Sequence, residues 1–124
     1  SLAWARGTGL FQKSYPTRNT KAVDNRMRQK EVQLETLFKA LADHTRLRLI
    51  HLIGDEEVCV CSCVETLKVN QPKISRHLAY LRRAGLVAAG RDGRWSHYRL
   101  VKPSDPHAAK MFNEVREWLA ENLP

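Results

Sequence analysis

The segment of residues 70–100 constrains the fold more strongly than any other part of the chain. Pro72 favours the start of a helix there, because its missing N–H costs nothing in a first helical turn. Gly85 ends this helix, whose apolar residues recur at helical spacing and are Ile74, Leu78 and Leu81. Two short strands are expected next, around Asp92-Gly93, since Asp-Gly is a strong hairpin signal. A helix followed by a hairpin is therefore the centre of the predicted fold.

Further helices are predicted on both sides of this centre. A first helix is expected from residue 26, with an apolar stripe made of Val32, Leu34, Leu37, Phe38 and Leu41. Asp43 is the expected N-cap of a second helix ending at Gly54, although Arg46 stands where a capping-box acid would be. A brief extended segment at 58–60, a short helix over 61–69 and a last helix over 107–122 complete the order. This order predicts a mainly α fold with a β-hairpin wing, a winged helix-turn-helix.

Basic residues are concentrated in two blocks of the 124-residue chain, which is short enough for one domain. Lys and Arg number 21 against 13 Asp and Glu, giving a net charge of +8 that indicates a polyanionic partner. Residues 1–30 form one block and residues 73–102 the other, each with a single acid. Residues 1–25 lack a clear apolar period, so we expect a flexible basic arm there, part of which could come from an expression vector. The folded domain is expected over residues 26–124.

The predicted helix after Pro72 has the character of a DNA recognition helix. Its N-terminal turns, the end that reaches base edges in the major groove, carry Gln, Lys, Ser, Arg and His side chains. The hairpin tip adds arginines that suit phosphates or a minor groove. The candidate DNA-binding residues are Gln71, Lys73, Ser75, Arg76, His77, Arg83, Arg91 and Arg94. RNA is a weaker alternative, because the sequence has no aromatic-rich strand on which single-stranded bases would stack.

The cysteines stand close together at Cys59, Cys61 and Cys63, in a chain with no apparent export signal or membrane span. We therefore expect a cytoplasmic protein without a membrane partner, in which these thiols stay reduced or bind a soft ion such as As(III) or Sb(III). An extended backbone would point Cys59 and Cys61 to one side, whereas a helix would pair Cys59 with Cys63. Binding by all three would have to unwind the short helix and so displace the recognition helix, which predicts ligand-induced loss of DNA binding.

Four motifs together resemble the ArsR/SmtB family of metalloregulatory repressors, most closely its arsenic-responsive members. They are Leu37-Phe38-Lys39-Ala40-Leu41-Ala42-Asp43-His44-Thr45-Arg46, Cys59-Val60-Cys61, Gln71-Pro72-Lys73-Ile74-Ser75-Arg76-His77-Leu78 and Gly93-Arg94-Trp95-Ser96-His97-Tyr98-Arg99-Leu100. The resemblance covers about residues 30–120 and leaves the basic arm outside it.

The resemblance implies a homodimer on double-stranded operator DNA that dissociates when an effector, As(III) or Sb(III), binds. The first and last helices of the 26–124 domain would form the interface, with candidate residues Leu34, Met111, Val115, Trp118 and Leu119. Cys59 and Cys61 match the first two cysteines of the arsenic-sensing members. The position of the third cysteine in those members is occupied here by Val64, and Cys63 lies one residue before it. Cys63 is therefore either a ligand after rearrangement or an inert core residue, in which case an external thiol or hydroxide completes the site.

Other functions fit the sequence less well. An enzyme is not expected, because the chain has no Gly-rich phosphate loop, no paired catalytic carboxylates and no catalytic cofactor motif. Sensing of Cd, Pb or Zn is an alternative, but the arm has no cysteine, and Trp118 stands where the zinc-type members have a second histidine. A thiol-redox-sensing repressor of the same fold is the closest rival.

Overall fold

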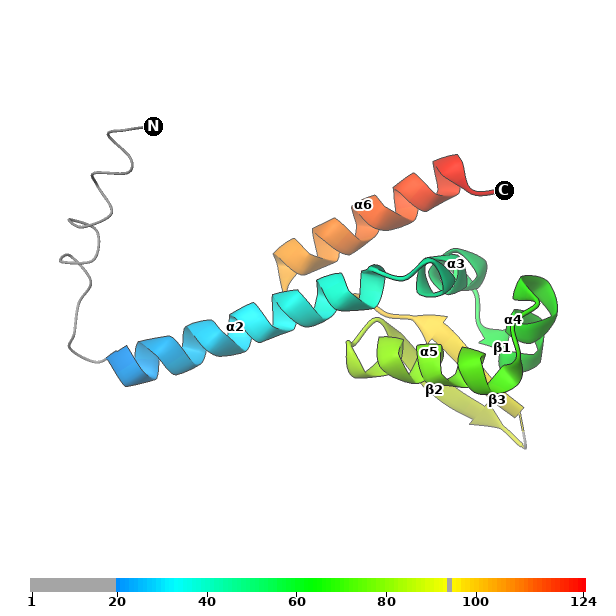
Figure 1. Ribbon diagram of the computed structural model, residues 1–124, viewed down its shortest axis with the longest axis horizontal. Helices are drawn as coiled ribbons and strands as arrows, with labels where there is room; N and C mark the ends of the chain where they lie inside the picture. The colour runs from blue at the N-terminus through cyan, green and yellow to red at the C-terminus, as the bar shows by residue number, and fades with distance from the viewer. Residues whose placement is uncertain (1–19, 94) are drawn as a thin grey trace. The chain divides into compact units, whose positions relative to one another are not determined.

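The computed structural model describes residues 20–93 and 95–124 of the chain, which divides into two units at residues 1–32 and 33–124. The second unit contains the helices and the small sheet that matter for function (Figure 1). In chain order the elements are α2 (Thr20–Leu41), α3 (His44–Ile53), β1 (Val58–Cys59), α4 (Val60–Leu67), α5 (Gln71–Arg83), β2 (Val87–Asp92), β3 (Trp95–Leu100) and α6 (Pro106–Asn122). This order confirms the predicted helical fold with a β-hairpin wing.

Side-chain caps set where three of the helices begin. The Asp43 carboxylate accepts a hydrogen bond from the backbone N–H of Arg46 at 3.0 Å, and so caps α3. Asn70 caps α5 in the same way, and Asp105 caps α6. Each cap satisfies an N–H that has no partner within its own helix. At the other end of α3, Gly54 has φ +54°, a left-handed conformation that favours glycine, which confirms the predicted C-cap.

The sheet has three antiparallel strands in the order β1-β3-β2. In the predicted hairpin, Val87 lies opposite Leu100 and Asp92 opposite Trp95. The short strand β1 pairs with the other side of β3, where Val58 faces Tyr98 and Cys59 faces His97. This second pairing was not predicted, because two residues carry no periodicity from which a partner could be inferred. It joins the segment that precedes α4 to the wing.

The core lies where α3, α5 and α6 meet the sheet and the end of α2. Ile74, Leu78 and Leu81 of α5 are fully buried, as predicted, together with residues of the other elements such as Leu49, Ile53 and Leu86. The stripe predicted for the first helix is only partly correct, because it divides between two environments. Leu37 is buried and Leu41 is half-buried, whereas Val32, Leu34 and Phe38 have exposed fractions of 58%, 42% and 50%.

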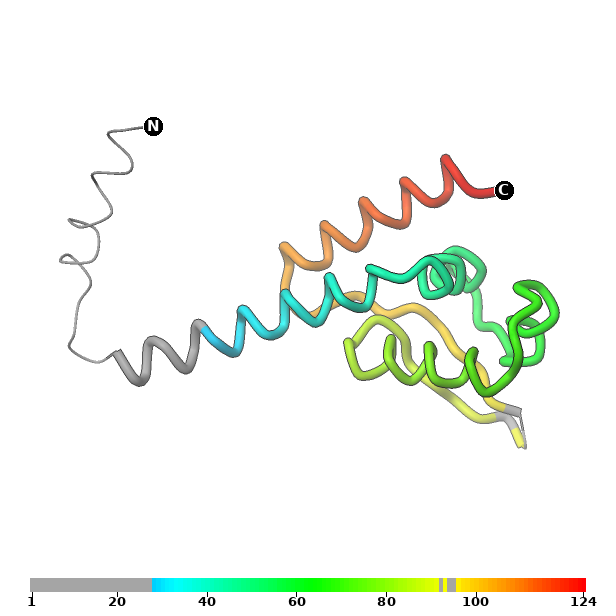
Figure 2. Tube along the Cα trace, viewed as in Figure 1, coloured from blue at the N-terminus to red at the C-terminus, as the bar shows by residue number. Residues whose placement is uncertain are grey.

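Two polar contacts hold α6 to the segment around α3. The Nε2 atom of His51 lies 3.1 Å from the backbone oxygen of Pro124, at the end of the chain that follows α6 (Figure 2). Arg116 donates a hydrogen bond of 2.7 Å to the carboxylate of Asp55. Together with the buried Phe112 and Leu119, these contacts dock α6 onto the domain.

Some boundaries differ from the prediction. The helix expected from residue 26 begins at Thr20, so residues 20–25 are helical, and α4 begins one residue earlier than expected, at Val60. Residues 1–19, the larger part of the predicted arm, lie outside the described residues. Of the helices in residues 20–93 and 95–124, none has the length and apolar character to cross a membrane.

Candidate functional site

The exposed side of α5 carries most of the residues predicted to bind DNA. Gln71, Lys73, Ser75, Arg76 and Arg83 are exposed, and His77 is half-buried. Arg91 is exposed on β2, and Arg94 lies outside the described residues. The N-terminal turn of α5 is fixed by the cap from Asn70, whose side-chain oxygen lies 3.0 Å from the backbone nitrogen of Lys73. The helix therefore presents a rigid polar and basic end, as a recognition helix requires.

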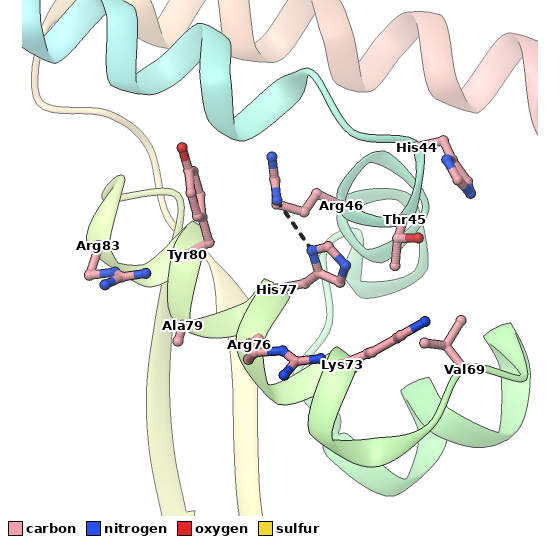
Figure 3. Close-up of a pocket in the computed structure, with 10 residues that line it drawn as sticks. All are labelled: His44, Thr45, Arg46, Val69, Lys73, Arg76, His77, Ala79, Tyr80 and Arg83. Carbon is pink, nitrogen blue, oxygen red and sulfur yellow. Dashed lines mark hydrogen bonds between the residues drawn. The ribbon is translucent and has the colours of Figure 1, made fainter.

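A groove of about 820 Å³ runs between the start of α3 and this side of α5 (Figure 3). It is lined by His44, Thr45, Arg46, Val69, Lys73, Arg76, His77, Ala79, Tyr80 and Arg83. Three arginines and a lysine contribute to this lining, and no acidic residue does. Such a groove favours a phosphate group or another anion, because its charges are clustered and its walls partly exclude water.

Arg46 and His77, which line the groove, form a cluster with Asp43. An Nη1 of Arg46 lies 3.2 Å from Nδ1 of His77, and the nearest Asp43 oxygen lies 3.8 Å from the same nitrogen. Burial lowers the pKa of His77, since it penalises the charged imidazolium. Burial opposes ionisation of Asp43, but the hydrogen bond from the backbone of Arg46 and the neighbouring cations outweigh it and lower its pKa. The cluster therefore favours a neutral His77 beside an ionised Asp43.

Arg46 and Tyr80 are parts of the site that were not predicted from the sequence. The guanidinium carbon of Arg46 lies 4.2 Å from the centre of the Tyr80 ring, and that of Arg83 lies 5.8 Å from the same centre. Tyr80 also packs against the core. In the sequence, Arg46 is a basic residue at a position where a capping-box acid is common, and it ends the first of the four motifs.

Cys59 and Cys61 lie together at the junction of β1 and α4. Their sulfur atoms are 2.7 Å apart, within hydrogen-bond distance of each other. Cys59 is the N-cap of α4, and its sulfur accepts a hydrogen bond from the backbone N–H of Cys61 at 3.4 Å. Cys59 is half-buried and Cys61 exposed, so a small ligand can reach the pair from solvent.

The two thiols of this pair differ in acidity. The hydrogen bond between the two thiols lowers the pKa of Cys59, and further hydrogen bonds from backbone N–H groups add to this effect. The same contact raises the pKa of Cys61. Cys59 is therefore the thiol that loses its proton first. The thiolate is the form of cysteine that binds a soft ion.

Cys63 lies apart from this pair, in the hydrophobic core. Its side chain is fully buried, and burial raises its pKa to about 11. Within residues 20–93 and 95–124, no three His, Cys, Asp or Glu side chains come together in a way that could hold a metal ion. Thiolate bonds of about 2.3 Å to one ion require sulfurs no more than about 4.6 Å apart. The sulfurs of Cys59 and Cys61 meet this condition in the folded chain.

The residues predicted to form a dimer interface lie on or beneath an apolar surface. Trp118 has an exposed fraction of 57%, Leu34 is also exposed, and Met111 and Val115 are half-buried. Leu119 is 1% exposed and belongs to the core, so it supports this surface from below. An apolar groove of about 370 Å³ crosses the surface and is lined by Phe38, Leu41, Ala42, Leu47, Val115, Trp118 and Leu119.

Comparison with known proteins identifies the family. Residues 43–89 match the family model described as bacterial regulatory protein, arsR family. An arsenic resistance transcriptional regulator from Pseudomonas putida is 54% identical over 89 residues, which cover 68% of this chain and 70% of the relative. An arsenical resistance operon repressor from Escherichia coli is 46% identical over 86 residues, covering 68% and 72%.

A solved structure supports the same fold. It is a homodimeric winged helix-turn-helix DNA-binding domain from Mycobacterium bovis, described as a possible ArsR-family transcriptional regulator. It is 25% identical, has a TM-score of 0.61, and the similarity covers 90% of this chain and 94% of that one. The chain therefore belongs to the ArsR family of bacterial regulatory proteins and is a transcriptional regulator, not an enzyme.

Proposed function

We propose that this protein is a cytoplasmic repressor that binds operator DNA as a homodimer and releases it when Cys59 and Cys61 bind As(III) or Sb(III). The observation that carries this proposal is the pair of accessible sulfur atoms 2.7 Å apart at the first turn of α4. The names of the Escherichia coli and Pseudomonas putida relatives, which concern arsenic resistance, support the choice of metalloid.

DNA would lie against the basic side of α5 and the wing. The exposed Gln71 and Arg76 are suited to base edges in a major groove, because Gln pairs with adenine and Arg with guanine. Lys73 and Arg83, which line the groove beside α3, are suited to phosphates. Arg91, which is exposed on β2, would extend these contacts toward the neighbouring minor groove.

The metalloid would bind through the thiolates of Cys59 and Cys61. As each As–S bond forms, the thiol proton leaves with a hydroxide of arsenous acid as water, so the reaction needs no oxidant. A third position remains for hydroxide or for an external thiol, because Cys63 is buried in the folded chain. Cys59 also accepts the N-cap hydrogen bond from Cys61, and this bond would be lost when the sulfur binds arsenic.

Two connections would carry the effect of binding to the DNA-reading elements. Cys59 and Cys61 flank the start of α4, which packs against the recognition helix α5. Cys59 also pairs with His97 of β3, the strand that supports the wing. A change in the backbone at residues 59–61 would therefore act on both α5 and the wing, and a small displacement of either lowers the fit to DNA.

The proposal is tested by measuring DNA release by arsenite for the wild type and for a variant carrying both Cys59→Ser and Cys61→Ser. The probe is a DNA duplex that the wild-type protein selects from a random-sequence pool. The double variant should bind this duplex with affinity near that of the wild type and should not release it with arsenite. The matched control Ser62→Ala, at the exposed position between the two cysteines, should respond as the wild type does.

Two outcomes would contradict the proposal. Arsenite release that persists in the double variant would exclude these thiols as the binding site. Loss of DNA binding by the double variant without arsenite would mean that the pair has a structural role.

The closeness of the two sulfurs also favours a redox sensor, in which peroxide would oxidise both thiols to a disulfide and be reduced to water. Release of the wild type by peroxide alone would favour that second function.

A further inference from the structure

The side chain of Arg46 joins three helices of the domain. Arg46 lies in α3, and its Nε donates a hydrogen bond of 2.8 Å to the backbone oxygen of Ala40 in α2. Its Nη2 donates a second bond of 2.9 Å to the backbone oxygen of Lys39. Its Nη1 lies 3.2 Å from Nδ1 of His77 in α5, and Tyr80 of α5 stacks against the guanidinium (Figure 3).

The chemistry of arginine suits this position in particular. The carbonyls of Lys39 and Ala40 lie in the last turn of α2, where helix carbonyls lack partners within the helix. A cation there also interacts favourably with the helix dipole. The planar guanidinium holds five N–H donors in a fixed arrangement, so one side chain reaches both carbonyls and His77 while its face lies on Tyr80. Lysine has the charge but not this geometry.

The same contact fixes the hydrogen of the His77 ring. Arginine can only donate, so Nδ1 of His77 must accept the bond from Nη1. In a neutral ring the hydrogen then resides on Nε2, which leaves Nε2–H as a donor. His77 lines the groove beside Lys73 and Arg76, where such a donor is available to an acceptor on DNA.

We propose that Arg46 is a positioning residue for DNA recognition, which holds α5 against the end of α2 and keeps the hydrogen of His77 on Nε2. This inference rests on the proposed DNA-binding function. The α2 helix also carries the exposed apolar residues Leu34 and Phe38, which lie on the proposed dimer surface. Arg46 therefore connects the helix that would set the spacing of two protomers to the helix that would read each half-site. A change in the placement of α5 would misalign both half-sites of a dimer at once.

The test compares Arg46→Lys with Arg48→Lys, a matched control at an exposed position of the same helix. Affinities are measured for the selected duplex and for a shuffled duplex over a series of salt concentrations. Arg46→Lys should bind the selected duplex about tenfold more weakly, as expected for lost bonds to a charged group, with little change on shuffled DNA. Its salt dependence should equal that of the wild type, because no phosphate contact is lost. Arg48→Lys should behave as the wild type.

The ring nitrogens of His77 provide a second readout that a general loss of stability would not change. In the wild type, their NMR chemical shifts should report hydrogen on Nε2 alone. In folded Arg46→Lys they should report a mixture of the two neutral forms. Tyr80→Leu, which removes the face under the guanidinium and leaves its hydrogen bonds, gives a milder second variant. Tyr80→Leu should show a smaller loss of specificity than Arg46→Lys. If Arg46→Lys does not fold, the specificity of Tyr80→Leu tests the proposal instead.

Three results would overturn the inference. Equal losses on both duplexes, with a salt slope smaller by about 0.9, would mean that Arg46 contacts a phosphate directly. Wild-type specificity in folded Arg46→Lys, or in Tyr80→Leu if the first variant is unfolded, would mean that the contact positions nothing. Hydrogen on Nδ1 of His77 in the wild type would contradict the assigned bond. Failure of the wild-type protein to bind any duplex would instead refute the proposed function.

Discussion

Three cysteines within five residues occupy two different environments, because the chain changes from strand to helix between them. Cys59 ends β1 and caps α4, which brings its sulfur next to that of Cys61. Cys63 lies one helical turn after the cap and points into the core. The sequence predicted that no single regular structure would gather all three thiols. It could not decide which of them would be buried, because that depends on the helices that pack against α4.

Cys63→Ala tests the division of roles among the cysteines. We expect the variant to release DNA with arsenite as the wild type does, because the accessible pair Cys59 and Cys61 is intact. Removal of the buried sulfur should lower the free energy of unfolding by about 1–2 kcal/mol, since it leaves a small cavity in the core. Denaturant unfolding and arsenite titration of the DNA complex measure the two effects. A folded variant that no longer responds to arsenite would show that Cys63 is a required ligand.

Individual residues were predicted best where their role is local. The predicted cap Asp43 acts within three residues of its own position, so the sequence contains the whole signal. The role of Arg46 depends on carbonyls six and seven residues earlier and on His77, 31 residues later. No local pattern encodes such a contact, and the residue could be recognised only in the folded chain.

The helix α3 begins at a side-chain cap. Asp43 accepts the hydrogen bond that starts this helix and stands beside the charge of Arg46. Apolar periodicity predicted the helices of the domain, but it could not decide which side of α2 would be covered. Leu37 and Phe38 belong to the same stripe, yet one is buried and the other exposed, because only the packed partner helices settle the orientation. The pairing of β1 with β3 was missed for a related reason, since its partner is distant in sequence.

The capping of α3 leads to a prediction about pH. Because the pKa of Asp43 is lower in the folded chain, its ionised form stabilises the fold above the unfolded pKa of about 3.9. This contribution is lost as the pH falls through the folded pKa. Asp43→Asn keeps a capping oxygen but no charge, so it should be less stable than the wild type at pH 7, and this difference in the free energy of unfolding should shrink as the pH falls through the folded pKa of Asp43. Asp43→Ala removes the cap and should cost about 1 kcal/mol more than Asp43→Asn at pH 7.

Chemical denaturation at several pH values measures these differences. His77, which lies near Asp43, titrates in all three proteins, so comparison at each pH removes most of its contribution. A difference between Asp43→Asn and the wild type that stayed constant from pH 7 to pH 3 would contradict the role of the carboxylate charge.

The folded unit of residues 33–124 has two surfaces of contrasting chemistry. One is the basic groove beside α5, and the other is the apolar surface around Phe38 and Trp118. We propose that DNA binds at the first and a second copy of the chain at the second. The sequence predicted most of both surfaces, because charge clusters and helical stripes are visible in it. The grooves themselves were not predicted, since each is lined by residues from separate elements.

The proposed dimer surface is tested with Trp118→Glu. A charge placed at this exposed apolar residue should prevent close packing of two copies and convert the dimer to a monomer. Operator affinity should then fall by at least about tenfold, because two half-sites are no longer bound together. Sedimentation equilibrium and DNA binding measure the two effects.

Ala120→Glu is the matched control for this variant. It introduces the same charge at an exposed position of α6, about 200° around the helix from Trp118. The control should remain a dimer. A folded Trp118→Glu variant that also stayed a dimer would show that the two copies associate through another surface.

The central claim is that binding of a metalloid to Cys59 and Cys61 weakens the hold of this protein on its DNA. The most direct test is an arsenite titration of the wild-type complex with its selected duplex, followed by fluorescence anisotropy under reducing conditions. We predict dissociation that saturates at one arsenic per protomer and reverses when a competing dithiol removes the arsenic. A complex that survives saturating arsenite, but dissociates with peroxide when the reductant is left out, would contradict the claim.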